Sequence, residues 1–253
     1  MNRQQSFGEP ERGFVVAADG TAVLRALGYT DFDAAWRDRS GRPERTTPHR
    51  WTLAHRLGDR TVFRKVRSER AGDARNEWRR AHELTALGLT VPEPLALGVA
   101  GRRSVILLGA VPGRPVQDLL AASGPSPSTT AFVLRRVVPV VATLHGAGFV
   151  HRDLYWNHLF AEDLDPDGPP VGLIDVERVF RPRWRRSRWV VKDLAGLLAS
   201  WPGTLPWSLA LRGLRALGHR TDRAWLERIA RKARRIRDHR PKYRGDEGPR
   251  AWA

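Results

Sequence analysis

The feature that most constrains the fold is a strand-rich segment that begins near residue 50 and ends near residue 110. WTLAHRL (51–57) and TVFRKV (61–66) both read as strands, and Gly58-Asp59 between them predicts a short hairpin. A helix is expected over residues 73–87, ending at Gly88, and a further strand over 104–108. This segment therefore predicts a small antiparallel sheet with one helix.

Beyond residue 115 the pattern becomes helical. Apolar residues recur at helical spacing over 129–145, where Pro139 is expected to bend the helix, and again over 222–238. A strand-rich part followed by a helical part predicts an α+β protein with two lobes. We assign residues 1–110 to the N-terminal lobe and residues 111–253 to the helical C-terminal lobe.

Residues 1–48 form an N-terminal extension whose role the sequence does not reveal. Residues 21–27 and 31–36 have short helical patterns, whereas SGRPERTTPH (40–49) is polar and is predicted to be a loop.

Composition narrows the location and the partners. The 253 residues include no cysteine, which excludes disulfides and cysteine-based zinc sites. The N-terminus lacks the apolar stretch of a secretory signal, and no apolar run approaches a membrane span, so a cytoplasmic location is predicted. Lys and Arg number 44 against 27 Asp and Glu, a net charge of +17, which favours anionic partners such as nucleic acid, a membrane surface or a phosphorylated substrate.

The segment VHRDLYWNHLF (150–160) contains the clearest chemical motif. Its His151-Arg152-Asp153 triplet lies in a loop after a long predicted helix. Phosphoryl transfer needs a carboxylate that receives the proton of the attacking hydroxyl, and Asp153 is the candidate. Alone, the triplet is equally compatible with chance in an arginine-rich chain.

Lys65 and a helix glutamate form a second candidate site. Strand alternation places Lys65 on the same face as Phe63, from which it can reach nucleotide phosphates. Glu77, beside the apolar Trp78, is the candidate partner of Lys65, and Glu83 is the rival that helical spacing cannot exclude. A solvent-exposed edge-strand lysine is the structural alternative for Lys65.

Asp175 ends the apolar strand VGLID (171–175), about twenty residues after Asp153. A carboxylate at such a strand end suits a magnesium ligand that also meets the nucleotide phosphates. The alternative is an aspartate that caps a turn.

Together these segments resemble the Kdo/WaaP lipopolysaccharide kinase family. The resemblance rests on LGDRTVFRKV, ARNEWRRAHELTALGLTVPEPLALG, HGAGFVHRDLYWNHLF, GLIDVERV, RWRRSRWVVKDLAGLLAS and the basic ARKARRIRDHR. It implies a protein-kinase-like two-lobe fold and ATP-dependent phosphorylation of a heptose or Kdo hydroxyl of the lipopolysaccharide inner core. Implied cofactors are ATP and Mg²⁺.

The resemblance also implies roles for single residues. Lys65 would contact the ATP phosphates with Glu77 as its partner, Asp153 in the His151-Arg152-Asp153 loop would be the base, and Asp175 the metal ligand. Asp193 in VVKDLAGL would brace the catalytic loop. His158 stands where protein kinases have an asparagine, either beside a metal or as a structural hydrogen-bonder, and the preference of Mg²⁺ for oxygen favours the structural role.

Other elements of protein kinases are missing. No GxGxxG precedes the first strands, so GRPERTTPHR (41–50) is the candidate for covering the phosphates. Val176-Glu177 follows Asp175, and no APE element is present, which disfavours a phosphorylation-switched activation loop.

Partners follow from the same resemblance and from the charge. The expected acceptor is the lipopolysaccharide core glycolipid, with peripheral contact to the anionic inner membrane. Residues expected at that surface are Arg181, Arg183, Arg185, Arg186 and Arg188. A protein or small-molecule acceptor is the enzymatic alternative, and a nucleic-acid-binding protein is the non-enzymatic one, which leaves the ordered kinase residues unexplained.

Overall fold

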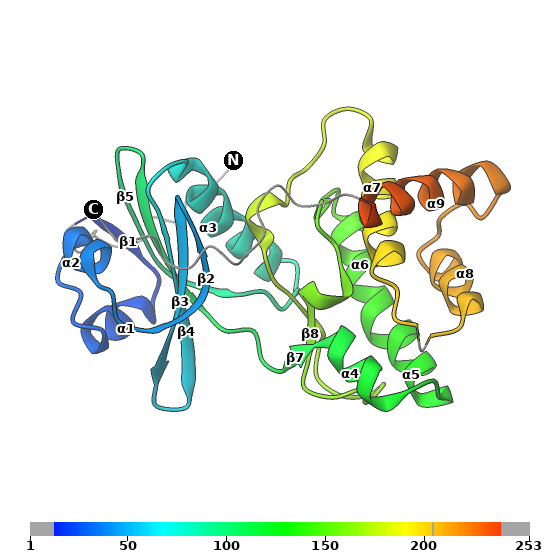
Figure 1. The fold of residues 1–253 in the computed structure, drawn as a ribbon, viewed down its shortest axis with the longest axis horizontal. Helices are drawn as coiled ribbons and strands as arrows, with labels where there is room; N and C mark the ends of the chain where they lie inside the picture. Colours follow the sequence, from blue (N-terminus) through cyan, green and yellow to red (C-terminus); the bar gives the residue numbers. More distant parts are fainter. Residues whose placement is uncertain (1–12, 204, 239–253) are drawn as a thin grey trace. The chain divides into compact units, whose positions relative to one another are not determined.

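The computed structural model describes residues 13–203 and 205–238, which fall into two compact units (Figure 1). The strand unit contains residues 13–82 and 92–110, and the helical unit contains residues 83–91 and 111–238 apart from residue 204. Residues 1–12 of the expected extension lie outside the described residues.

The strand unit is built on a six-stranded antiparallel sheet in the order β1-β5-β6-β4-β3-β2. The predicted hairpin is confirmed, because Leu57 pairs with Arg60 across the Gly58-Asp59 turn. The strands are β1 (Phe14–Val16), β2 (Arg42–Thr47), β3 (Arg50–Leu57), β4 (Arg60–Arg67), β5 (Glu93–Ala100) and β6 (Arg103–Gly109).

Helices cover both faces of this sheet (Figure 1). Ile106 and Leu108 of β6 pack with Ala74 and Trp78 of α3 (Ala71–Thr85). The alternate residues of β6 instead join a core with α1 (Gly20–Ala26) and α2 (Phe32–Arg37), which confirms the short helices expected in the extension. Strand alternation therefore decides which side chains of β4 face α3.

The prediction of a loop over residues 40–49 is wrong for β2, which pairs antiparallel with β3 and contains a register shift between Pro43 and Arg45. Most of its side chains are exposed, because it is the edge strand of the sheet. A strand with little burial shows no apolar alternation, so its composition resembles that of a loop. GRPERTTPHR is thus mainly strand β2 and the turn into β3, and its expected role in covering the phosphates stays a prediction.

The helical unit contains six α-helices and a small three-stranded sheet among its described residues. The strands are β7 (Arg114–Pro115), β8 (Leu159–Ala161) and β9 (Gly172–Leu173). The helices are α4 (Val116–Ser123), α5 (Pro127–Phe132), α6 (Val138–Gly146), α7 (Arg186–Ala199), α8 (Trp207–Ala216) and α9 (Arg223–Arg237).

The long helix expected over residues 129–145 is interrupted rather than only bent. A π-helical segment, Val133–Val137, joins α5 to α6, and Pro139 lies in the first turn of α6. Proline cannot donate a backbone hydrogen bond, and local changes of helical hydrogen bonding accommodate this loss.

Helices α7 and α9 share an apolar core. Val190, Val191 and Leu194 of α7 pack with Ile229 and Ala233 of α9. Among the described residues, no helix is both long enough and apolar enough to cross a membrane.

Candidate active site

In the strand unit, Lys65 lies on the face of β4 that is covered by α3. Its Nζ donates to Oε1 of Glu77 at 2.5 Å, and Arg67, two residues further along the strand, donates to Oε2 at 3.0 Å. The period of two along the strand explains why both cations reach the same carboxylate. Of the two glutamates considered from the sequence, Glu77 is thus seen to pair with Lys65.

Glu77 is completely buried. Burial alone would raise its pKa, but the charges of Lys65 and Arg67 outweigh this effect and hold the pKa below its usual value. Glu77 therefore remains a carboxylate that anchors the Lys65 ammonium group.

In the helical unit, Asp193 of α7 fixes the loop that contains the His151-Arg152-Asp153 triplet. Its two carboxylate oxygens accept from the backbone amides of His151 and Arg152, both at 2.7 Å, and Oδ2 also lies 3.1 Å from Nε2 of His145. Gly196 allows close approach, since a Cβ there would lie 2.4 Å from the carbonyl oxygen of Leu154. The loop is thereby joined to α6 and α7.

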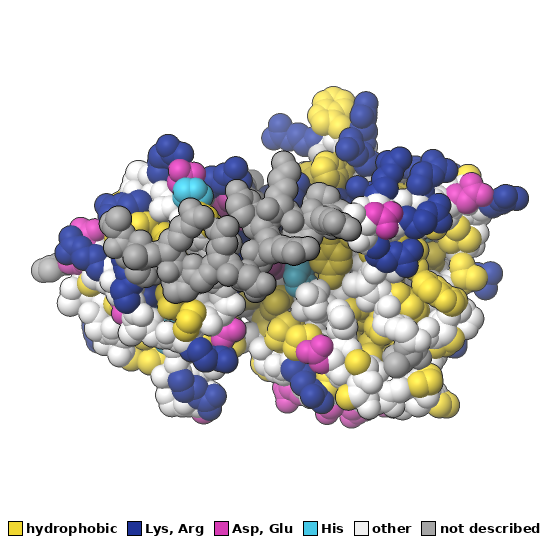
Figure 2. Space-filling view, in the orientation of Figure 1, with side chains coloured by type: hydrophobic (Ala, Val, Ile, Leu, Met, Phe, Trp, Pro, Cys, Tyr) yellow, Lys and Arg dark blue, Asp and Glu magenta, His cyan; other side chains and the backbone are white. Residues whose placement is uncertain are grey.

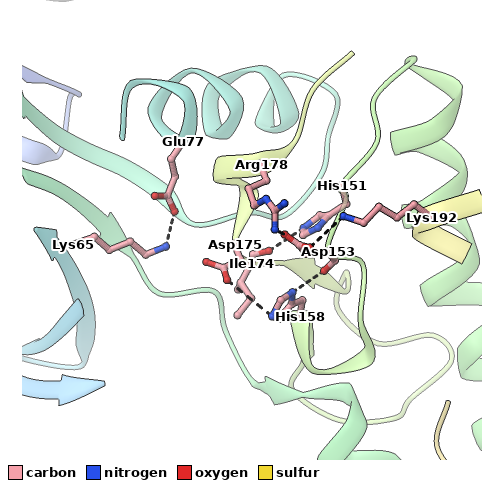
Figure 3. A network of polar contacts seen from close by, with 9 residues as sticks. All are labelled: Lys65, Glu77, His151, Asp153, His158, Ile174, Asp175, Arg178 and Lys192. Atoms are coloured by element: carbon pink, nitrogen blue, oxygen red, sulfur yellow. Dashed lines mark hydrogen bonds and ion pairs between the residues drawn. The ribbon is translucent and has the colours of Figure 1, made fainter. Parts of the chain in front are cut away.

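The Asp153 carboxylate lies between two cations from other elements (Figure 3). Arg178 donates to Oδ2 at 2.7 Å, and Lys192 Nζ lies 3.7 Å from Oδ1. Burial lowers the pKa of Lys192, an effect that the Asp153 charge partly offsets. The side chain of Asp153 is 18% exposed, so the carboxylate is accessible to a bound hydroxyl.

His158 lies between Asp153 and Asp175 (Figure 3). Its Nδ1 is 2.7 Å from the backbone carbonyl of Asp153; since a carbonyl only accepts, Nδ1 carries the proton. In the neutral ring Nε2 then has its lone pair free, and this atom lies 4.0 Å from Oδ2 of Asp175.

Asp175 lies just beyond β9, which is shorter than the predicted strand over 171–175. Its backbone is left-handed, with φ of 60°, and it precedes a 3₁₀ turn, Val176–Arg178. This turn follows directly and places Arg178 beside Asp153. The described residues contain no cluster of three or more potential metal ligands.

His151 and Arg152 support the loop from within the protein. His151 is fully buried, and its Nε2 lies 3.0 Å from the carbonyl oxygen of Ile174; burial lowers its pKa. Arg152 adopts a φ of 75°, and its guanidinium lies over the rings of Phe180 and Trp189 at 5.7 and 5.4 Å. The contacts described for these two side chains are thus with Ile174, Phe180 and Trp189, which hold the loop in place.

Comparison with known proteins identifies the family. A model described as "Lipopolysaccharide kinase (Kdo/WaaP) family" matches residues 49–217, which include both parts of the candidate site. The chain belongs to this family. Membership in the Kdo/WaaP family makes it a phosphotransferase of the lipopolysaccharide kinase type, as the sequence predicted.

Solved structures establish the fold of this Kdo/WaaP family member. The structure of "WaaP in complex with acyl carrier protein" matches with a TM-score of 0.73 and 24% identity, covering 88% of this chain and 98% of that one. An aminoglycoside-3'-phosphotransferase of type VIII matches with a TM-score of 0.53 and 21% identity, covering 84% and 97%. The predicted protein-kinase-like α+β fold is confirmed. A comparison with curated protein sequences finds no match.

The arginines predicted at a membrane surface differ in their surroundings. Arg181 lies over the ring of Phe149 at 4.3 Å, and Arg186 donates to the carbonyl of His145. Trp184 is 82% exposed, whereas Trp189 packs edge-on against Phe180 at 5.1 Å. All five arginines are exposed, and Trp184 is the fully projecting aromatic residue among them.

Sequence reasoning missed Arg178 and Lys192, the two cations on Asp153. They lie 25 and 39 positions after Asp153 in a chain with 44 Lys and Arg. Among so many cations, composition could not single out these two. A usable signal was their place beside recognised residues, because Arg178 follows Asp175 by three positions and Lys192 precedes Asp193.

Proposed function

We propose that this Kdo/WaaP family member transfers the γ-phosphoryl group of ATP to a hydroxyl of an inner-core lipopolysaccharide sugar, heptose or Kdo. The observation that carries the proposal is the accessible Asp153 carboxylate on a loop held by Asp193. Family membership supports the substrate class, and the two structural likenesses support the kinase-like fold.

Lys65 has the role of an ATP-phosphate ligand in this proposal. The ammonium group is held by a buried carboxylate, which leaves few orientations open to it. An oriented cation stabilises phosphate charge without having to reorganise during the reaction.

The residues present fit one Mg²⁺ ion that is completed by nucleotide phosphates. Asp175 supplies a hard carboxylate with a 28% exposed side chain, and Mg²⁺ is commonly held by one or two carboxylates together with phosphates. When bound, the ion would neutralise charge on the phosphates. His158 keeps a structural role through its hydrogen bond to the Asp153 carbonyl.

Asp153 acts as the general base. It accepts the proton of the acceptor hydroxyl as the oxygen–phosphorus bond forms and the bond to the ADP leaving group breaks. Arg178 and Lys192 orient the carboxylate and place positive charge beside the transferring group.

A transfer assay tests the proposal. Purified protein is incubated with ATP, Mg²⁺ and inner-core glycolipids that end in heptose or in Kdo, and mass spectrometry detects the added phosphate. We expect ADP release that depends on one of these acceptors. Transfer to a protein or a small-molecule alcohol, with none to either glycolipid, would contradict the acceptor and favour the alternative within the same fold.

We also propose that the enzyme works in the cytoplasm, at the inner face of the membrane, through residues 183–185. Trp184 is suited to headgroup depth, and each nearby cation adds about 1 kcal/mol near an anionic surface.

Co-sedimentation with anionic and neutral vesicles across a salt series tests this contact. The variant Arg183→Gln/Trp184→Ala/Arg185→Gln is expected to lose most of its binding to anionic vesicles, and salt should weaken binding of the unaltered protein. Equal binding by the variant would reject the idea. Tighter binding to duplex DNA than to anionic vesicles would support the nucleic-acid alternative.

A further inference from the structure

A second cationic site lies in the helical unit, between α7 and α9. Figure 2 shows Lys and Arg side chains gathered over these helices. They surround a pocket of about 390 Å³, large enough for a small sugar phosphate. The pocket is lined by Arg188, Trp189, Val191, Lys192, Arg228, Arg231, Lys232 and Arg235.

Several cations of α9 lie at spacings at which they repel one another, although Arg228 also lies over the ring of Trp225 at 5.2 Å. Arg228 and Lys232 are four residues apart, as are Arg231 and Arg235, and like charges at this spacing repel one another on a helix. None of these four makes an ion pair with any residue that the structure describes. By contrast, Arg223 on the same helix pairs with Glu227 at 2.8 Å.

Helix α7 adds charge at the opposite wall. Its first turn contains Arg188, which lines the pocket, and no acidic residue, although the positive end of a helix dipole favours an anion there. The dipole at the C-terminus of α9 favours Arg235, but it does not account for Arg228 or Arg231 nearer the middle of the helix. A bound anion would offset the repulsion from both helices.

Lys192 connects this pocket to the proposed base. Its side chain lines the pocket, and its Nζ lies 3.7 Å from Oδ1 of Asp153. Lys192 therefore belongs both to the pocket lining and to the surroundings of the carboxylate that receives the hydroxyl proton.

We propose that the α7/α9 pocket binds a phosphate group already present on the acceptor and so orients a nearby acceptor hydroxyl toward Asp153. Arginine guanidinium groups suit phosphate oxygens because they donate two parallel hydrogen bonds. The orienting role rests on the proposed kinase function, whereas phosphate binding itself does not.

Isothermal titration with glucose 6-phosphate as the probe, and glucose as the neutral control, tests the site. The pocket variant Arg231→Gln/Arg235→Gln is compared with Arg212→Gln/Arg215→Gln on α8, a matched loss of two exposed cations from the same unit. We expect the pocket variant to bind the sugar phosphate about tenfold more weakly and the α8 variant to change less than about twofold. Arg231→Lys/Arg235→Lys keeps the charge but not the paired guanidinium hydrogen bonds, so it should restore only part of the affinity.

Several outcomes would overturn the site. Unchanged affinity in the pocket variant would place the probe elsewhere, and equal weakening in the α8 variant would reduce the effect to net charge. If the pocket variant lost binding to phosphatidylglycerol vesicles but kept glucose 6-phosphate binding, the phosphate would belong to a lipid headgroup rather than to the acceptor.

Kinetics separate this inference from the proposed function. With an acceptor that carries a phosphate, the pocket variant should raise the KM for the acceptor about tenfold and also lower kcat, because the acceptor hydroxyl is less well oriented, while the KM for ATP stays nearly unchanged. Absence of transfer to any core acceptor would refute the proposed function, while the titration would still decide whether the pocket binds phosphate. A higher acceptor KM with an unchanged kcat would refute the orienting role and leave the pocket as a binding site only.

Discussion

Each unit places one carboxylate between two cations, and the two arrangements differ in their exposure to solvent. Glu77 is fully buried between Lys65 and Arg67, at 2.5 and 3.0 Å. Asp153 is 18% exposed between Arg178 and Lys192, at 2.7 and 3.7 Å. The difference in burial suits the two carboxylates to different roles. The buried Glu77 can only hold its cations in place, whereas the partly exposed Asp153 can also contact a substrate.

Asp153→Asn should produce the largest change in activity. The amide keeps the size of the side chain but cannot accept the hydroxyl proton, so turnover should fall about 10²- to 10⁴-fold. Because the ion pairs of Asp153 are partly exposed, the free energy of unfolding should change by no more than about 1 kcal/mol. Turnover and urea unfolding measure the two effects; near-normal turnover would contradict the assignment of the base.

Glu77→Gln should mainly lower the free energy of unfolding, whereas Asp153→Asn mainly lowers turnover. The change removes the buried negative charge that Glu77 supplies to Lys65 and Arg67, and loss of one partner of a buried pair costs about 3–5 kcal/mol of stability. Urea unfolding checks this value, and ATP binding should weaken as Lys65 loses its anchor. A loss of stability below about 1 kcal/mol would show that water reaches the side chains around Glu77. Glu77 and Asp153 would then differ little in their exposure to solvent.

Acidification should lower the stability of the protein in two steps, and the first step comes from partly or fully buried histidines. Burial lowers the pKa of His55, His82, His151 and His219, so these rings stay neutral in the folded protein while the unfolded chain binds protons below about pH 6.5. Stability should therefore be complete above that pH and fall as the pH decreases through it.

A second loss of stability should begin near pH 4.5, where the unfolded chain protonates a glutamate that the folded protein keeps charged. Thermal unfolding between pH 8 and pH 2 measures both losses. The variant Glu77→Gln should keep the first loss and lack the contribution of Glu77 to the second; an unchanged acid limb would contradict the lowered pKa of Glu77.

His158→Asn should have the smallest effect, below about tenfold in turnover. The asparagine amide can still donate to the Asp153 carbonyl, whereas the ring nitrogen near Asp175 is lost. His158→Ala removes both and should be slower than the asparagine variant. Complete loss of magnesium dependence in the asparagine variant, followed by metal titration, would show a ligand role for the imidazole.

Much of the fold was predictable because burial imposes a period on the sequence. The β3-β4 hairpin, α3 and α9 all have one face against a core, and their apolar residues follow strand or helical spacing. The edge strand β2 and the π-helical segment before Pro139 have no such signature, because the first is mostly exposed and the second arises from local hydrogen bonding.

The candidate site was predictable where a motif and its local context coincide. Lys65 and Glu77 belong to adjacent elements, so strand alternation and helical spacing narrowed the pairing to two glutamates. Arg178 and Lys192 reach Asp153 only through tertiary packing, and the one local hint was their place in the sequence near Asp175 and Asp193. The catalytic and metal roles themselves stay predictions.

The contacts of Asp193 have a consequence for protein engineering. It holds the catalytic loop through the amides of residues 151 and 152, groups that every amino acid except proline provides. The shape of the loop is thus encoded partly in α7, some forty positions away, rather than in the loop's own side chains. A graft of residues 150–158 into another scaffold would lose its conformation unless the segment of α7 around Asp193 and Gly196 were transplanted with it.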